Sequence, residues 1–136
     1  MKQLGEVNQR YISGIIGEIY VMFHVAQQKG YKPIFWRYIH KHSEIDLIYR
    51  PFANKLVFIE VRSVIVSRET GDLGIQIDRL LPWKKKSAII RACTGYVIRE
   101  TGYRTPSFEV FCAIVQLNPD LSLQSVTFHR IYENSQ

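Results

Sequence analysis

The sequence predicts an α/β or α+β structure in which helices pack on a single β-sheet. Helical periodicity of apolar residues occurs near the N-terminus and again in the second half of the chain, and apolar runs typical of strands follow each helical part. The chain has 136 residues, the length of one ordinary domain, and it contains no internal repeat or linker. We therefore expect residues 1–136 to form one domain with the element order αβββαββ.

The first expected element is a helix from about Asn8 to Gln28. Asn8 can cap its N-terminus, and Gly30 suits the left-handed residue that ends many helices. Apolar residues recur between these ends at spacings of three and four, as expected for a helix with one buried face. They are Ile12, Ile15, Ile16, Ile19, Phe23 and Ala26.

Two glycines and one glutamate stand out within this helix. Gly14 and Gly17 each weaken a helix by up to about 1 kcal/mol relative to alanine, which indicates that another backbone approaches closely. Glu18 lies in a column with Gly14, Val21 and Val25 that borders the apolar stripe. We therefore expect Glu18 to point inward.

Three strands are expected next, at Pro33–Ile39, Glu44–Tyr49 and Leu56–Val64. Pro51–Asn54 supplies the turn between the second and the third. Because the third strand is apolar on both faces, it is expected in the middle of the sheet.

The remaining elements are a helix and two strands. Ser67–Ile77 is rich in turn residues and leads into a helix from Leu80 or Pro82 to Arg99, with a buried stripe. Strands are expected at Ser107–Leu117 and Gln124–Tyr132, separated by a turn at residues 118–120. The stripe consists of Ile89, Ile90, Cys93 and Val97.

Carboxylates occur where the second and third strands should be buried. Because strand residues alternate between faces, Glu44, Asp46 and Ile48 are expected on one face, and Glu60 shares a face with Arg62 on the next strand. Ile45, Leu47 and Tyr49 are expected on the opposite face.

Asp46 and Glu60 are symmetric about the Pro51–Asn54 turn, so a hairpin would make them cross-strand neighbours. Two carboxylates that meet repel each other, which favours a divalent cation between them. Oxygen ligands favour Mg²⁺ or Mn²⁺. In the alternative interpretation Glu60 pairs with Arg62 or another cation, and Glu44 and Asp46 mark a solvated strand end.

The order of these motifs resembles the YraN-like family of the PD-(D/E)XK, restriction-endonuclease-like nuclease superfamily. The family's G-x-x-G-E pattern is similar to residues 14–18, its G-E-I-D-L-I segment to residues 43–48 with serine for the first glycine, and its F-V-E-V-K segment to residues 58–62. A lysine-led helix at residues 84–96 and a loose match at residues 108–110 follow in the same order.

This resemblance implies a mixed central sheet flanked by helices, with Asp46 and Glu60 as ligands of Mg²⁺ or Mn²⁺. It implies that Glu18 either is a further ligand of the cation or acts on the cation through a water molecule. It also implies a metal-dependent DNA endonuclease that acts on branched or damaged DNA in repair or recombination.

Arg62 departs from the family pattern, which has lysine at this position. A lysine can lose its proton and position the attacking water, whereas arginine stays charged. Arg62 can still stabilise charge on the scissile phosphate. The alternative function is therefore a catalytically impaired nuclease fold that binds DNA or a protein partner.

Basic residues suggest where DNA would bind. The chain carries a formal net charge of +6, which favours a polyanionic partner without proving one. Lys84, Lys85 and Lys86 lie in the first turns of the predicted helix, where cations oppose the helix dipole, and Arg91 follows. These four are candidate DNA contacts. Lys85 and Lys86 are also candidates to replace the missing motif lysine.

Other classes of protein are disfavoured. The chain has no apolar run of the roughly 20 residues that a membrane span needs and no signal-peptide pattern, so a cytoplasmic location is expected. Cys93 and Cys112 lack neighbours at ligand spacing and are expected as buried thiols. An exposed strand edge would suit a homodimer.

Overall fold

The computed structural model describes residues 2–66, 77–102 and 106–134. The expected order αβββαββ is confirmed, with one additional short helix before the second long one. The strand boundaries expected from the sequence lie within about three residues of those in the structure. The elements are α1 (Lys2–Lys29), β1 (Phe35–His40), β2 (Ser43–Phe52), β3 (Lys55–Ile65), α2 (Ile77–Leu80), α3 (Trp83–Thr101), β4 (Ser107–Leu117) and β5 (Leu123–Asn134).

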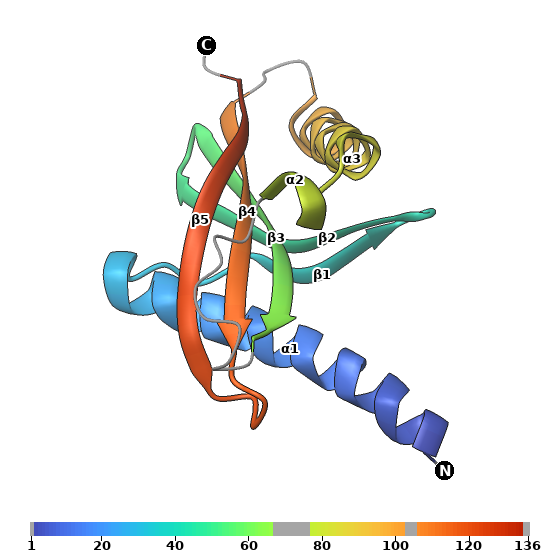
Figure 1. Ribbon diagram of the computed structural model, residues 1–136. Coiled ribbons are helices and arrows are strands. Elements are labelled where there is room, and N and C mark those ends of the chain that lie inside the picture. Colours follow the sequence, from blue (N-terminus) through green and yellow to red (C-terminus); the bar gives the residue numbers. More distant parts are fainter. Residues whose placement is uncertain (1, 67–76, 103–105, 135–136) are drawn as a thin grey trace.

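The five strands form one mixed sheet in the order β1-β2-β3-β4-β5 (Figure 1). β3 and β4 are parallel, and the other neighbours are antiparallel. The parallel pair needs a crossover, which contains α2 and α3. β3 is central, as its apolar faces predict. β1 and β5 are the two edges of the sheet, and the expected homodimer stays a prediction.

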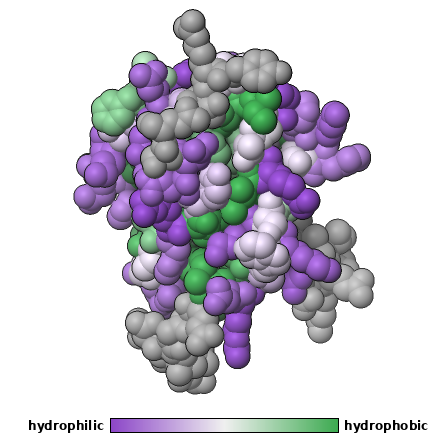
Figure 2. Space-filling model, turned by 90° about the horizontal axis from the view of Figure 1, so that it is seen from above, coloured by the Kyte–Doolittle hydropathy of each residue, from purple (hydrophilic) through white to green (hydrophobic). Residues whose placement is uncertain are grey.

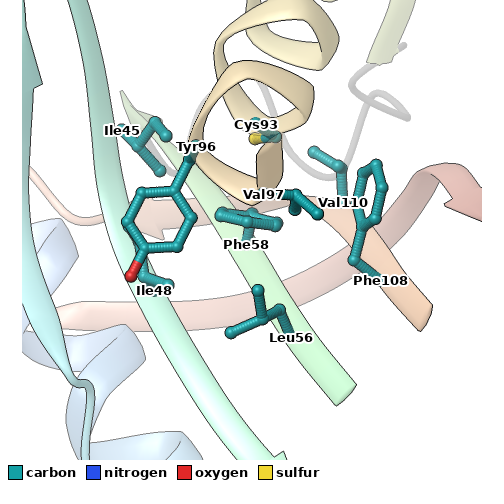
Figure 3. Close-up of a cluster of buried hydrophobic side chains, with 9 residues drawn as sticks. All are labelled: Ile45, Ile48, Leu56, Phe58, Cys93, Tyr96, Val97, Phe108 and Val110. Carbon is teal, nitrogen blue, oxygen red and sulfur yellow. The ribbon is translucent and has the colours of Figure 1, made fainter. Parts of the chain in front are cut away.

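Helices cover both faces of this sheet (Figure 1). On the α3 face, Tyr96 packs edge-on against Phe58 at a centroid distance of 5.6 Å (Figure 3). Tyr96 also packs edge-on against Tyr38, at a centroid distance of 5.0 Å. On the α1 face, Val21 packs with residues of the strands. A five-stranded mixed sheet flanked by helices is consistent with the expected restriction-endonuclease-like fold. The α3-side cluster contains Ile45, Ile48, Leu56, Phe58, Cys93, Tyr96, Val97, Phe108 and Val110.

Hydrophobic side chains form a central band on the face seen from above in Figure 2, with hydrophilic side chains on either side. The second long helix, α3, begins at Trp83 after Pro82 and buries Cys93, Tyr96 and Val97. Ile89 and Ile90 of the expected stripe are only partly buried. The turn-rich stretch predicted at residues 67–77 lies outside the described residues except for Ile77, which begins α2.

The two ends of α1 differ in how well the sequence predicted them. Gly30 has φ 73° and its N–H donates to the carbonyl of Ala26 at 2.9 Å, which confirms it as the residue that ends the helix. Asn8 is not a cap, because the helix already begins at Lys2. The upstream residues continue the helical conformation, so the capping potential of Asn8 is not used.

Of the two glycines that the sequence analysis singled out, Gly14 and Gly17, only Gly17 marks a close approach. A Cβ atom at Gly17 would lie 1.9 Å from Ser63 Oγ and 3.3 Å from Ser63 Cβ, so α1 crosses β3 closely at this point. At Gly14 nothing lies within 4 Å, and the prediction for that glycine is wrong. The next residue after Gly17, Glu18, is 6% exposed and points inward as expected.

We expect Gly17→Ala to lower the free energy of unfolding by about 1–3 kcal/mol, because the added methyl group displaces the Ser63 hydroxyl from a packed position. The double variant Gly17→Ala, Ser63→Ala should recover most of this loss. Gly14→Ala is the matched control, and it should gain up to about 1 kcal/mol from helix propensity alone. Urea unfolding followed by circular dichroism measures all three. Equal effects at both glycines would contradict the close crossing.

Candidate functional site

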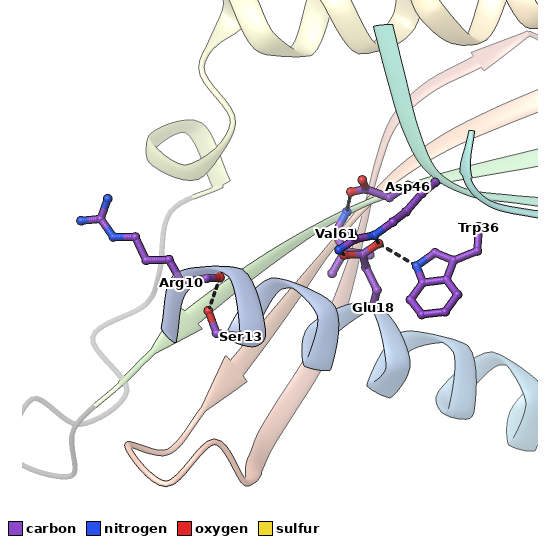
Figure 4. A network of polar contacts seen from close by, with 7 residues as sticks. Arg10, Ser13, Glu18, Trp36, Asp46 and Val61 are labelled. Carbon is purple, nitrogen blue, oxygen red and sulfur yellow. Dashed lines mark hydrogen bonds and ion pairs between the residues drawn. The ribbon is translucent and has the colours of Figure 1, made fainter. Parts of the chain in front are cut away.

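Asp46 and Glu60 meet where β2 separates from β3. The hairpin register pairs Leu47 with Ile59 and Ile48 with Phe58, which places residue 46 opposite residue 60 as the turn symmetry predicts. The backbone ladder stops at Leu47. Beyond it, Asp46 Oδ2 accepts the Val61 N–H at 2.9 Å (Figure 4). A carboxylate thus replaces the missing carbonyl acceptor, and this bond fixes the side chain beside β3.

The separation of the strands also corrects one predicted face of β2. Ile45 packs with Ile48 in the α3-side cluster, although strict alternation places it with Leu47 and Tyr49, which face α1. The reason is that β2 turns away from β3 at Asp46, so alternation is interrupted between Ile45 and Leu47. The turn opens space between the strands for the two carboxyl groups.

The two carboxyl groups are close enough to influence each other's charge, and both are mostly buried. Burial, and after it the charge of Asp46, raises the pKa of Glu60 to about 8. Burial likewise raises the pKa of Asp46 to about 6, while the Val61 N–H opposes this change. Without a cation, the pair therefore holds one proton at neutral pH.

Arg62 lies beside this pair on β3. Its Nη2 is 3.5 Å from Glu60 Oε1, and its side chain is 29% exposed. Its Nε is buried and has no hydrogen-bond partner among the described residues. The ion pair between Glu60 and Arg62, which the alternative interpretation predicts, is therefore present beside the carboxylate pair. Arg62 still has hydrogen-bond donors for a further ligand.

Glu18 reaches the same region from α1, and its oxygens are already engaged. Trp36 Nε1 donates to Glu18 Oε1 at 2.8 Å (Figure 4). Arg37 donates from Nε to Oε1 at 3.1 Å and from Nη2 to Oε2 at 3.0 Å. The charge of Glu18 contributes to the raised pKa of Asp46, so the two acids are near each other. In this geometry Glu18 binds Arg37 directly. It is therefore better placed to reach a cation through a water molecule than to bind the cation itself.

Sequence reasoning missed Arg37. It lies between two bonded pairs of the β1–β2 ladder, Trp36 with Leu47 and Tyr38 with Ile45, and therefore opposite Asp46. Its φ of 60° is in the left-handed region, which non-glycine residues seldom adopt in a strand. The available signal was the buried Glu18, because a buried carboxylate requires a cationic partner.

The donor set fits a cation of the Mg²⁺ type. The described residues include no group of three or more His, Cys, Asp and Glu side chains that could hold a metal ion. Asp46 and Glu60 alone supply two carboxylates. Mg²⁺ is typically held by one or two carboxylates, with water and substrate phosphate as its other ligands. The site therefore suits a cation shared with a phosphate substrate and does not suit a closed protein cage.

The remaining candidate residues form no ion pair with Asp46 or Glu60 in the described ranges. Glu44 is exposed, and its charge contributes to the raised pKa of both acids. Lys84 and Lys85 are exposed at the start of α3, and Lys86 is partly buried. None of these lysines forms an ion pair with Asp46 or Glu60 in the described part of the chain. The idea that Lys85 or Lys86 replaces the motif lysine gains no support from this geometry.

Arg91 lines a basic hollow. This hollow of about 280 Å³ lies between α3 and the turn that joins β1 to β2, and His40, Arg91 and Arg99 supply its basic side chains. Cationic side chains around an open hollow can contact a phosphate. The candidate DNA contacts thus continue along α3 beyond its lysine-rich start.

Comparison with known proteins gives one family match. A family model described as "Uncharacterised protein family UPF0102" matches residues 17–114, which is more than half of the chain and includes Glu18, Asp46, Glu60 and Arg62. A search of curated proteins found no match. None of the helices in the described ranges is long and apolar enough to cross a membrane.

Proposed function

Because the chain belongs to the uncharacterised protein family UPF0102, the YraN-like family of the PD-(D/E)XK nuclease superfamily, we propose that it is a metal-dependent DNA endonuclease. The observation that carries this proposal is the buried Asp46–Glu60 pair, which lies at the point where β2 leaves β3. Two neighbouring carboxylates in a protein interior are costly, and a divalent cation would relieve that cost. Branched or damaged DNA is the proposed substrate, in repair or recombination.

Asp46 and Glu60 would hold Mg²⁺ or Mn²⁺ in this proposal. The bound cation would polarise the phosphodiester and lower the pKa of the attacking water. The Val61 N–H orients Asp46 for this role, because its bond to Oδ2 fixes the carboxyl group beside β3. Arg62 lies next to Glu60 and stays protonated, so it can bind the scissile phosphate and stabilise its charge.

A catalytically impaired DNA-binding protein is the second candidate. Two observations favour it: Arg62 stands where the family has lysine, and Glu18 has both oxygens bound by Arg37 and Trp36. The basic hollow at Arg91 and the exposed lysines of α3 would support DNA binding in either case.

A cleavage assay separates the two candidates. Duplex, single-stranded and branched DNA of one sequence are incubated with the protein in Mg²⁺ or in Mn²⁺, with EDTA as the negative condition. The endonuclease proposal predicts internal cuts in the presence of metal. If neither wild type nor Arg62→Lys cuts any of the three substrates while both still bind DNA, the impaired nuclease is correct.

Arg62→Lys should raise the cleavage rate by about 10-fold or more at pH 8–9. A lysine at this position can lose its proton and act on the attacking water, and positioned general bases contribute roughly 10²–10⁴-fold. The matched control is Arg130→Lys, the same chemical change at an arginine that pairs with Glu133 on β5. A rate that falls in Arg62→Lys would show instead that the arginine fork itself stabilises the transition state.

A further inference from the structure

A surface beside the proposed active site combines two aromatic rings with an arginine. We propose that this surface, formed by Tyr11, Trp36 and Arg37 and called here the stacking surface, binds an unpaired nucleotide of DNA. The proposed nuclease would then act where a duplex opens into single strand. That the stacking surface lies beside a cleavage site rests on the proposed function, whereas the binding of an unpaired nucleotide to it does not.

The guanidinium of Arg37 lies between the two rings. Its Cζ is 5.6 Å from the centroid of Tyr11 and 5.9 Å from that of Trp36, within the range of cation–π contacts. Tyr11 is 61% exposed and Trp36 is 44% exposed. Tyr11 comes from α1 and Trp36 from β1, so two separate elements place exposed aromatic side chains around one fixed positive charge.

Hydrogen bonds hold this surface rigid. The indole N–H of Trp36 donates to Glu18, and Arg37 donates to both oxygens of the same carboxylate. Glu18 is itself buried, so the ring of Trp36 is anchored to the body of the protein at its polar atom. What remains available to a ligand is the apolar ring. A rigid ring loses little entropy when a base stacks on it.

The backbone of Arg37 indicates that its placement has a cost. Arg37 has a φ of 60°, and non-glycine residues in this left-handed region are strained and are concentrated at functional sites. The hydrogen bond to Glu18 raises the pKa of Arg37, so the guanidinium keeps its charge at all physiological pH values. The strained conformation directs this charge toward Glu18 and between the two rings.

Nucleic acid fits this combination better than an apolar partner does. Proteins bind single strands through aromatic rings and arginines on which bases stack, whereas the bases of a duplex already stack on each other. The net charge of +6 favours a polyanion, and exposed Arg10 adjoins Tyr11 on α1. Arg37 lies opposite Asp46 across the β1–β2 ladder. A nucleotide stacked here would therefore lie next to a phosphodiester bound at the carboxylate pair.

Tryptophan fluorescence provides a direct test. The chain has two tryptophans, and Trp83→Phe leaves Trp36 as the sole reporter. Trp83 is 75% exposed, so its replacement should not disturb the fold. This protein is titrated with a single-stranded oligothymidylate in EDTA, and with a blunt duplex of equal length. We expect the single strand to quench Trp36 and to bind more tightly than the duplex.

Variants at Tyr11 identify the contribution of stacking. Tyr11→Ala, made in the same background, should weaken single-strand binding by about 5-fold to 100-fold, the range found for loss of one base-stacking ring. Tyr11→Phe keeps the ring and should bind like the parent. Because Tyr11 is largely exposed, neither change should lower the melting temperature, which circular dichroism checks.

Three results would overturn the inference: equal quenching by duplex and single strand, unchanged binding in Tyr11→Ala, or equal losses in Tyr11→Ala and Tyr11→Phe. None of these measurements depends on cleavage. A protein that quenches as expected but never cuts DNA would refute the endonuclease and keep the stacking surface. A protein that cuts DNA without quenching would do the opposite.

Discussion

Replacement of Asp46 by asparagine is expected to reduce metal-dependent DNA cleavage by at least about 100-fold while the fold stays intact. Asparagine has nearly the same size, and its amide oxygen can still accept the Val61 N–H that now bonds Asp46 Oδ2 at 2.9 Å. The packing at the end of the β2–β3 ladder should therefore persist. What is lost is one of the two carboxylates proposed to hold the cation, and hard divalent ions depend on such charge.

Glu44→Gln is the matched control for this variant. Glu44 precedes Asp46 by two residues on β2 and influences the pair through its charge, but its side chain is exposed. Its neutralisation should change the cleavage rate by less than about 3-fold. Both variants are compared with wild type in Mg²⁺ and in Mn²⁺, together with calorimetric titration of Mn²⁺. Cleavage that survives Asp46→Asn would remove the carboxylate pair from the mechanism.

The sequence predicted the parts of this site that depend on local geometry. A short turn fixes the register of an antiparallel hairpin, so the symmetry of Asp46 and Glu60 about residues 51–54 was sufficient to bring them together. Helical periodicity likewise placed Glu18 on an inward-facing column, and it is buried. Each of these predictions needs only one regular element or one turn.

The sequence could not predict the parts that depend on departures from regular structure. The left-handed conformation of Arg37 has no signal in its residue type, and its bond to Glu18 joins elements that are separate in the chain. Trp36 is 44% exposed and bonds Glu18 through its indole N–H, and this contact also joins two elements that are separate in the chain. The interrupted alternation at Ile45 has the same origin, because β2 leaves β3 only in the context of the complete sheet.

The stability of the metal-free protein is expected to fall as pH rises from about 5 to 8, and Glu60 should be the main cause. Burial, followed by the charge of Asp46, raises the pKa of Glu60 from 4.5 to about 8. Between these values the folded protein binds more protons than the unfolded chain, so the free energy of unfolding decreases with pH and levels off above about 8. The raised pKa of Asp46 acts in the same direction over a lower range. The total change is on the order of a few kcal/mol, since one pKa unit corresponds to about 1.4 kcal/mol.

Urea unfolding in EDTA at pH 5, 6.5 and 8 measures this decrease, and Glu60→Gln should remove most of it. At pH 8 the glutamine variant should be more stable than wild type, because it eliminates a buried ionised carboxyl group next to Asp46. Mn²⁺ should restore the wild type at pH 8 and have little effect on the variant, since the cation replaces the shared proton. Glu133→Gln, on the exposed side of β5, is the control and should follow the wild-type pH profile. If Glu60 only braces the sheet through Arg62, the opposite result is expected, because removal of its charge would then destabilise the protein at pH 8 with or without metal.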